Sequence, residues 1–199
     1  LALWYPWDMT AILVFTLGLY FLVKENLPGF YMIFIVGTFN KETTCFLTLI
    51  YLLTAIDRQS LKHVALHTLV QILLWFGIKA GLWWAFHEHA SAMLYQNKLM
   101  DNIEYLADWN HLIGMASNFG FLWLIILPFL RKLNNSFIRR SLFVLLIYTM
   151  GMFYVGNIYE LRIFGEMIPV VLLSFIVLIQ SLSEEHVRQK IVFYSDSTQ

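Results

Sequence analysis

Charged residues are scarce in this chain. Only 13% of its 199 residues are Asp, Glu, Lys or Arg, whereas an ordinary soluble domain has about 25%. Hydrophobic residues make up 59%, and 17 Phe, 10 Tyr and 7 Trp could not all be hidden in one water-soluble core of this size. The composition therefore excludes a soluble enzyme or a soluble binding module. It predicts an integral membrane protein whose first partner is the lipid bilayer.

Three further absences narrow the classes of function. Positive charge is not in excess, because 13 Lys and Arg balance 13 Asp and Glu, so we expect no nucleic-acid partner. Cys45 is the only cysteine and cannot form an intramolecular disulfide. The sequence contains no glycine-rich phosphate loop and no serine-nucleophile motif, which removes the common signatures of soluble enzymes.

The apolar runs predict an all-α, polytopic transmembrane bundle of about six or seven membrane segments, since a span needs about 20 mostly apolar residues. The expected segments are residues 9–23, 30–39, 44–56, 64–86, 112–130, 141–155 and 167–182. Segments 30–39 and 44–56 are short, so they form either one long helix with a polar centre or two short, tilted or re-entrant helices. Residues 90–111 are loosely amphipathic, and we expect them to lie on the membrane surface.

Basic residues predict the orientation of the bundle. Arg131, Lys132, Arg139 and Arg140 bracket one short loop, which the positive-inside rule places in the cytoplasm. Alternation of the spans then places the acidic and mixed-charge motifs on the outer side. Residues 1–182 are expected to form a single transmembrane domain, and 183–199 a polar, partly disordered cytoplasmic tail.

Two polar motifs interrupt apolar stretches on the predicted outer side. Residues 156–169 carry Glu160, Arg162 and Glu166, and residues 40–43 carry Lys41 and Glu42. A guanidinium fork suits a phosphate or a carboxylate, and a neighbouring Glu would orient it. Charges inside membrane segments are costly and usually mark sites, so all five are candidate substrate-binding residues. The structural alternatives are an Arg–Glu clamp that pins the first loop and a simple outer turn at the second.

Asp8 and Lys79 complete the candidate site. Asp8 is the candidate catalytic residue, although a position at the start of a helix explains it equally well. Lys79 lies within a span, where an ammonium group needs a partner, and we expect it to pair with Glu42 or Glu160 or to extend outward. We assign no metal and no cofactor. The sequence His87-Glu88-His89 has a spacing that does not place both imidazoles on one helix face, and no third ligand is tied to it.

Three sequence motifs carry a resemblance to a known family. Tyr-Pro-x-Asp enters the first span at residues 5–8, GTFNKETTCFL occupies 37–47 and GNIYELRIFGEMIP occupies 156–169. Together they resemble polytopic bacterial membrane proteins of the GT-C class of glycosyltransferases. The resemblance implies a polyprenyl-phosphate-linked sugar as donor, an outward-facing cavity and a location in the bacterial inner membrane. It also implies that Lys41 and Arg162 contact the lipid phosphate, that Asp8 is the catalytic acid, and that the chain is the C-terminal portion of a longer protein.

Whether the chain is an enzyme is left open by its sequence. The rival interpretation is a non-catalytic transmembrane subunit that packs against other membrane subunits of a larger complex. A scaffold should have few ionisable groups in its spans, and Lys79, Lys41 and the segment 160–166 argue against that, so the sequence favours a substrate site. A transporter is a third interpretation, favoured if the polar break at residues 40–43 lies at the bilayer midplane.

Overall fold

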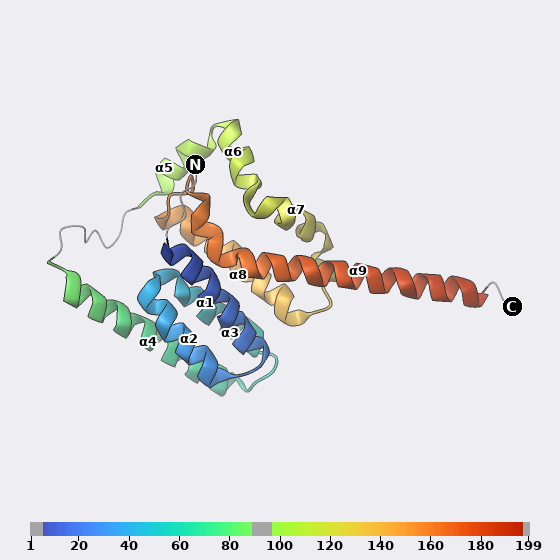
Figure 1. The fold of residues 1–199 in the computed structure, drawn as a ribbon, viewed down its shortest axis with the longest axis horizontal. Helices are drawn as coiled ribbons and strands as arrows, with labels where there is room; N and C mark the ends of the chain where they lie inside the picture. Colours follow the sequence, from blue (N-terminus) through green and yellow to red (C-terminus); the bar gives the residue numbers. More distant parts are fainter. Residues whose placement is uncertain (1–5, 89–96, 197–199) are drawn as a thin grey trace.

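The chain is entirely helical in a computed structural model, which describes residues 6–88 and 97–196 (Figure 1). The described residues contain no strand, which confirms the all-α prediction. The α-helices are α1 (Pro6–Val23), α2 (Leu27–Asn40), α3 (Cys45–Ala55), α4 (Leu61–Phe86), α5 (Leu99–Leu106), α6 (Trp109–Ala116), α7 (Leu122–Ile126), α8 (Ser136–Val155) and α9 (Ile168–Asp196). Short 3-10 helices are η1 (Glu42–Thr44), η2 (Asn118–Phe121), η3 (Leu127–Lys132) and η4 (Leu161–Met167).

Helices α1 and α2 form a tightly packed hairpin. Asn26 ends the turn by accepting a hydrogen bond from Gly29 N at 3.0 Å, which caps the start of α2. Gly29 and Gly37 allow the two helices to approach closely, because a Cβ atom would lie only 2.6 Å from the Phe21 ring at Gly29 and 2.4 Å from Val14 Cγ1 at Gly37. The hairpin returns the chain to the end of the bundle where α1 begins.

A break at Lys41 separates α2 from η1 and α3. The Lys41 backbone is extended, with φ −151° and ψ 144°, so the helix cannot continue through it. Helix α3 then runs back beside α2, and the rings of Phe30 and Tyr51 stack at 6.3 Å. The structure thus resolves the two alternatives for residues 30–56 in favour of two short helices.

The described residues include three helical segments long and apolar enough to cross a membrane, namely Leu61–Phe86, Ser136–Val155 and Leu161–Glu184. A fourth is possible if the bent pair Trp109–Ala116 and Asn118–Lys132 counts as one span, with a bend of 67° between its halves. This assignment rests on length and composition. Helices α1, α2 and α3 are shorter, so the predicted count of six or seven segments stays a prediction.

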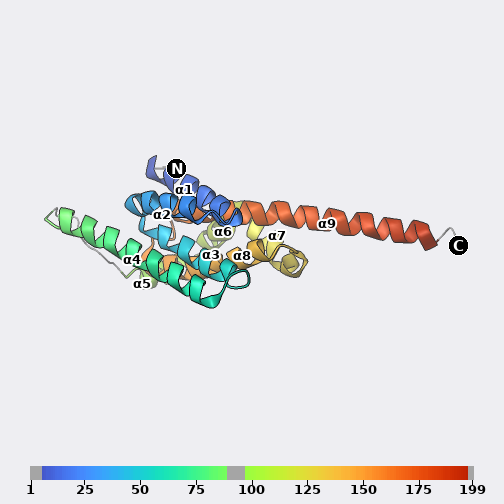
Figure 2. The same ribbon diagram turned by 90° about the horizontal axis from the view of Figure 1, so that it is seen from below.

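Two long helices extend away from the bundle (Figures 1 and 2). Helix α4 is apolar along most of its length, yet only Val64 and Gln71 are buried, so nearly all of its surface is open to lipid or to another protein. Helix α9 continues without interruption to Asp196. Residues 183–196 of the predicted polar tail are thus helical, because a polar sequence can extend a helix that packing has already nucleated.

Helix α5 is anchored by one buried side chain. Asn102 Nδ2 donates to the carbonyl oxygens of Phe153, at 2.8 Å, and Gly156, at 2.7 Å, and its Oδ1 accepts from Ile158 N at 3.2 Å. The opposite face exposes Met100 and Ile103, as an amphipathic surface helix should. Residues 99–106 of the expected amphipathic segment are thus helical, its place on the membrane surface stays a prediction, and Asn102 fixes the turn that leads from α8 into η4.

Candidate functional site

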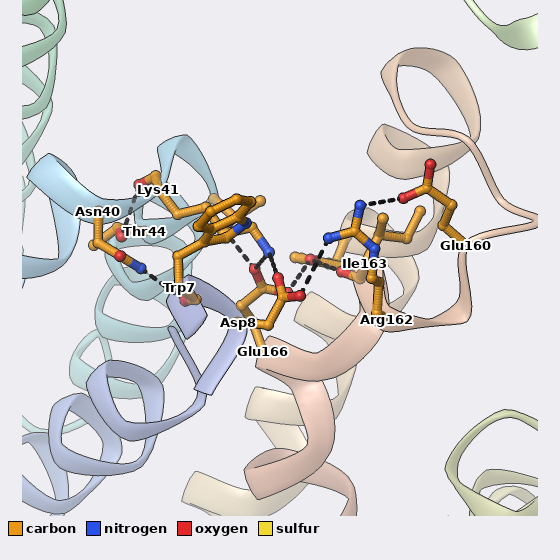
Figure 3. Close-up of polar contacts among 11 residues, drawn as sticks. Trp7, Asp8, Asn40, Lys41, Thr44, Glu160, Arg162, Ile163 and Glu166 are labelled. Atoms are coloured by element: carbon orange, nitrogen blue, oxygen red, sulfur yellow. Dashed lines mark hydrogen bonds and ion pairs between the residues drawn. The ribbon is translucent and has the colours of Figure 1, made fainter. Parts of the chain in front are cut away.

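Asp8 is the centre of a buried ion-pair network (Figure 3). It lies in the first turn of α1, and its side chain is only 2% exposed. Its Oδ1 is 3.1 Å from Lys41 Nζ, at the break after α2, and its Oδ2 is 3.2 Å from Arg162 Nη1, in η4. One carboxylate therefore joins two cations that come from distant parts of the sequence.

Glu166 is the second buried carboxylate of the network. Its side chain is 1% exposed, and its Oε1 lies 2.6 Å from Lys41 Nζ. The Thr43 hydroxyl donates to Oε1 at 3.1 Å, and the Tyr148 hydroxyl donates to Oε2 at 2.7 Å. Tyr148 also contacts the Ile163 carbonyl oxygen. Both oxygens of Glu166 are thus satisfied, as a buried carboxylate requires.

Arg162 and Glu160 form the outer edge of the network. Arg162 Nη2 is 2.5 Å from Glu160 Oε2, although a spacing of two residues does not favour such a pair within a helix. The contact forms because Glu160 precedes η4 in a non-helical conformation, with φ −91° and ψ 82°. The side chains of Lys41 and Arg162 are 19% and 20% exposed, whereas Asp8 and Glu166 are buried. Glu160, at 30%, and the two cations therefore form the more accessible part of the network.

The break after α2 is held against the start of α1 by hydrogen bonds. Asn40 Nδ2 donates to the Trp7 carbonyl oxygen at 3.1 Å, and Thr44 Oγ1 donates to the Lys41 carbonyl oxygen at 3.0 Å. The second bond satisfies a carbonyl oxygen beyond the end of α2, where a helix leaves such groups free. Both bonds also fix Lys41 beside Asp8.

The environment of Lys41 favours its charged form. Burial by itself lowers the pKa of Lys41, but the attraction and hydrogen bonds of Glu166 and Asp8 outweigh burial and raise the pKa above its ordinary value of 10.5. The ammonium group is thus an integral part of the network, together with Arg162.

Glu42 and Lys79 lie beside the network rather than in it. Glu42 is exposed, and its carbonyl oxygen accepts a hydrogen bond from Trp75 Nε1 of α4 at 2.9 Å. Lys79 lies one turn further along α4, half-buried, and Glu42 attracts it electrostatically. Within the described part of the chain, Lys79 makes no ion pair. Of the two expected partners of Lys79, the structure brings Glu42 near.

Tyr148 and Thr43 are members of the network that the sequence did not reveal. Tyr148 lies in the middle of an apolar helix, where a tyrosine is unremarkable. Thr43 follows two charged residues, and that position was the only available signal. Neither side chain is charged, so neither stood out from the composition around it.

Basic residues gather at the opposite end of the bundle. They lie in or beside the turns of residues 24–26, 56–60 and 133–135. Ion pairs hold these turns together: Arg58 pairs with Glu25 at 3.5 Å, and Arg140 pairs with Asp57. We call this the basic end. Its basic residues are Lys24, Arg58, Lys62, Arg131, Lys132, Arg139 and Arg140. The chain thus separates its charges, with the carboxylate-rich network at one end and a surplus of cations at the other.

No metal-binding group emerges from the described residues, in which no three His, Cys, Asp or Glu side chains are arranged to hold an ion. The His87-Glu88-His89 motif is only partly covered, because His89 lies outside residues 6–88 and 97–196.

Five of the seven candidate residues form one connected network, which offers two cations to an anionic ligand and buried carboxylates to a proton or a hydroxyl group. No protein family, curated protein or solved structure matches this chain.

Proposed function

We propose that this chain is an integral protein of the bacterial inner membrane that transfers a sugar from a polyprenyl-phosphate donor to an acceptor hydroxyl. The observation that carries the proposal is the position of Asp8 between Lys41 and Arg162. Two adjacent cations at the membrane edge are suited to the charge and shape of a phosphate group. Glu166 orients Lys41, and Glu160 orients Arg162.

The pairing of Asp8 suggests how binding and chemistry are linked. Both oxygens of Asp8 are engaged by cations in the ligand-free network. A phosphate that binds Lys41 and Arg162 takes over these interactions and releases Asp8. The freed carboxylate then accepts the proton of the acceptor hydroxyl as that oxygen attacks the anomeric carbon of the sugar. The bond between this carbon and the phosphate oxygen breaks, and the polyprenyl phosphate leaves as an anion held by Lys41 and Arg162. Asp8 is thus the proposed general base.

The charge distribution supports an orientation for the proposed enzyme. The surplus of cations at the basic end favours a cytoplasmic location for that end and for the C-terminal part of α9. The network then faces outward. Helices α1, α2 and α3, which are short, cross the membrane in part or tilted, so that the bundle has six or seven membrane segments.

The phosphate site is tested by direct binding. The protein is reconstituted in nanodiscs with a short-chain polyprenyl monophosphate, and the bound lipid is counted by native mass spectrometry. We expect Lys41→Ala and Arg162→Ala each to abolish binding. Lys98→Ala should not change it, because Lys98 pairs with Asp101 on α5, outside the network. Unchanged binding in both network variants would refute the phosphate site.

Removal of one partner from a buried ion pair typically costs about 3–5 kcal/mol, so a network variant can fail to fold. The double variant Lys41→Gln/Glu166→Gln removes one charge of each sign and leaves Asp8 paired with Arg162, so it avoids an unpaired buried charge. It should remain folded and lose lipid binding. Circular dichroism and gel filtration in detergent report folding independently of the ligand.

A non-catalytic subunit of a larger membrane complex is the second candidate. It is favoured by the fact that every charged group of the network already has an ion-pair partner, as in a structural clamp. The apolar surface of α4 would then pack against another subunit. This function predicts that Arg162→Ala lowers thermal stability and subunit association while the binding of polyprenyl monophosphate is the same as in the unmodified protein.

A further inference from the structure

A second polar group lies between α2, α3 and α4, apart from the ion-pair network. The Tyr31 hydroxyl is 2.8 Å from His67 Nδ1. The ring of Tyr51, from α3, packs edge-on against His67 with centroids 6.3 Å apart, and the ring of His63 lies 4.2 Å from His67. His63 is exposed near the start of α4, so this group extends inward from the surface.

Gln71 lies one turn beyond His67 and next to Tyr31. Its side chain is fully buried, and although its amide lies near the Tyr31 hydroxyl, neither Oε1 nor Nε2 makes a hydrogen bond of normal geometry among the described residues. An amide that loses both its donor and its acceptor interactions on burial is costly. Buried groups of this kind are usually satisfied by an ordered water molecule.

The hydroxyls of Thr48 and Thr68 also indicate ordered water, as a comparison with two buried threonines shows. Buried Thr38 and Thr54 donate to carbonyl oxygens of their own helices, at 2.7 and 2.6 Å, which is the common arrangement for a helical threonine. The buried hydroxyls of Thr48, on α3, and Thr68, on α4, have no such partner in the described part of the chain. These two residues belong to helices that pack against each other, α3 and α4.

We propose that ordered water occupies the interface of α2, α3 and α4 at Gln71, Thr48 and Thr68. This water extends the pair of Tyr31 and His67 into a hydrogen-bonded chain that opens at His63. The chain gives the imidazole of His67 access to solvent protons from within the membrane domain. The titratable groups that face His67 are Tyr31 from α2, Tyr51 from α3 and His63 from α4. The proposal is independent of glycosyl transfer.

Thermal unfolding in detergent tests the proposal by the sign of its effect. Gln71→Met keeps the size of the side chain and removes its polar atoms. If water satisfies Gln71, the variant leaves that water without its hydrogen bonds to the amide. The melting temperature then falls by about 2–4 °C or more. If the interface is dry, the variant removes an unsatisfied group and the melting temperature is unchanged or higher. Either of these last results would overturn the proposal.

A matched pair of threonine variants controls for the loss of a hydroxyl. Thr48→Val and Thr38→Val make the same isosteric change in buried helical positions, but only Thr38 satisfies its hydroxyl within its own helix. We expect Thr48→Val to lower the melting temperature more than Thr38→Val does. An equal or smaller effect at Thr48 would count against bound water.

Nuclear magnetic resonance detects the water directly, without relying on stability. In protein labelled with 15N at glutamine side chains, the Gln71 amide signal is identified by its disappearance in Gln71→Met. We expect a magnetisation-transfer cross-peak between this amide and water in the unmodified protein, weakened by at least half in Thr48→Val. The absence of the cross-peak in the unmodified protein would overturn the proposal.

Discussion

At the residue scale, Tyr148 is the network member whose contribution is easiest to isolate. Its hydroxyl is the hydrogen-bond donor to Glu166 and to the Ile163 carbonyl oxygen, both in a buried environment. Tyr148→Phe removes the hydroxyl and leaves these acceptors short of a donor, so we expect a loss of about 1–3 kcal/mol in the free energy of unfolding. Chemical unfolding in mixed micelles measures it. Tyr20→Phe, on the exposed side of α1, is the control and should change stability by less than about 0.5 kcal/mol.

Because of Lys41, the stability of the folded protein depends on pH in the alkaline range. Its pKa is raised in the folded protein, so the stabilisation from its charge is fully present below its unfolded pKa of 10.5 and is lost as the pH rises through the higher folded value. The facing groups are Asp8, Glu166 and Arg162. We expect the melting temperature to fall more steeply above pH 10.5 in the unmodified protein than in Lys41→Gln/Glu166→Gln. Parallel curves for the two proteins would contradict this assignment.

The sequence identified the charged members of the network because a charge inside an apolar run is conspicuous. It could not show which of them pair, since Asp8 and Arg162 are far apart along the chain and meet only through the packing of α1 against η4. Hydroxyl groups gave less signal still. Threonine and tyrosine are common in apolar helices, so Thr43 and Tyr148 became recognisable only when Glu166 was found between them.

At the scale of elements, Asn102 determines how α5 is held against the turn between α8 and η4. Asn102→Asp keeps the acceptor oxygen but removes both donor bonds and places a carboxylate against two carbonyl oxygens. We expect a loss of about 1–3 kcal/mol and faster hydrogen exchange in residues 153–158. Asn97→Asp is the control, because Asn97 uses only its acceptor oxygen, which receives a hydrogen bond from Leu99 N. Unchanged exchange in Asn102→Asp would show that α5 is held by other contacts.

Breaks in the helices were predictable where the residues themselves disfavour a membrane helix. The polar residues 40–43 made a break after α2 one of two predicted alternatives, whereas residues 112–130 were expected to form one span and instead turn at residues 118–121. The conformation of that second turn was not predictable. Phe119, Gly120 and Phe121 all have positive φ, between 57° and 62°, and two of them are bulky residues that avoid this region. Only Gly120 is suited to it, so tertiary packing must impose the rest.

At the scale of the whole molecule, the separation of charge predicts how the bundle sits in the membrane. The network lies where α1 begins, and the cations of the basic end lie where α1 ends, so the two charge groups are separated by the length of a helix. A membrane potential and the positive-inside preference act on this asymmetry in the same direction. Both favour insertion with the basic end in the cytoplasm.

Cysteine labelling tests this orientation in intact cells. In a Cys45→Ser background, one cysteine is introduced at exposed Glu104, on α5 near the network, or at exposed Asn134, in the turn at the basic end. We expect a membrane-impermeant maleimide to label Glu104→Cys in intact cells and Asn134→Cys only after the membrane is permeabilised. The reverse pattern would place the network in the cytoplasm. An acceptor and a lipid-linked donor would then have to reach Asp8 from the inside, and the outward-facing site would be refuted even if the phosphate contacts of Lys41 and Arg162 proved correct.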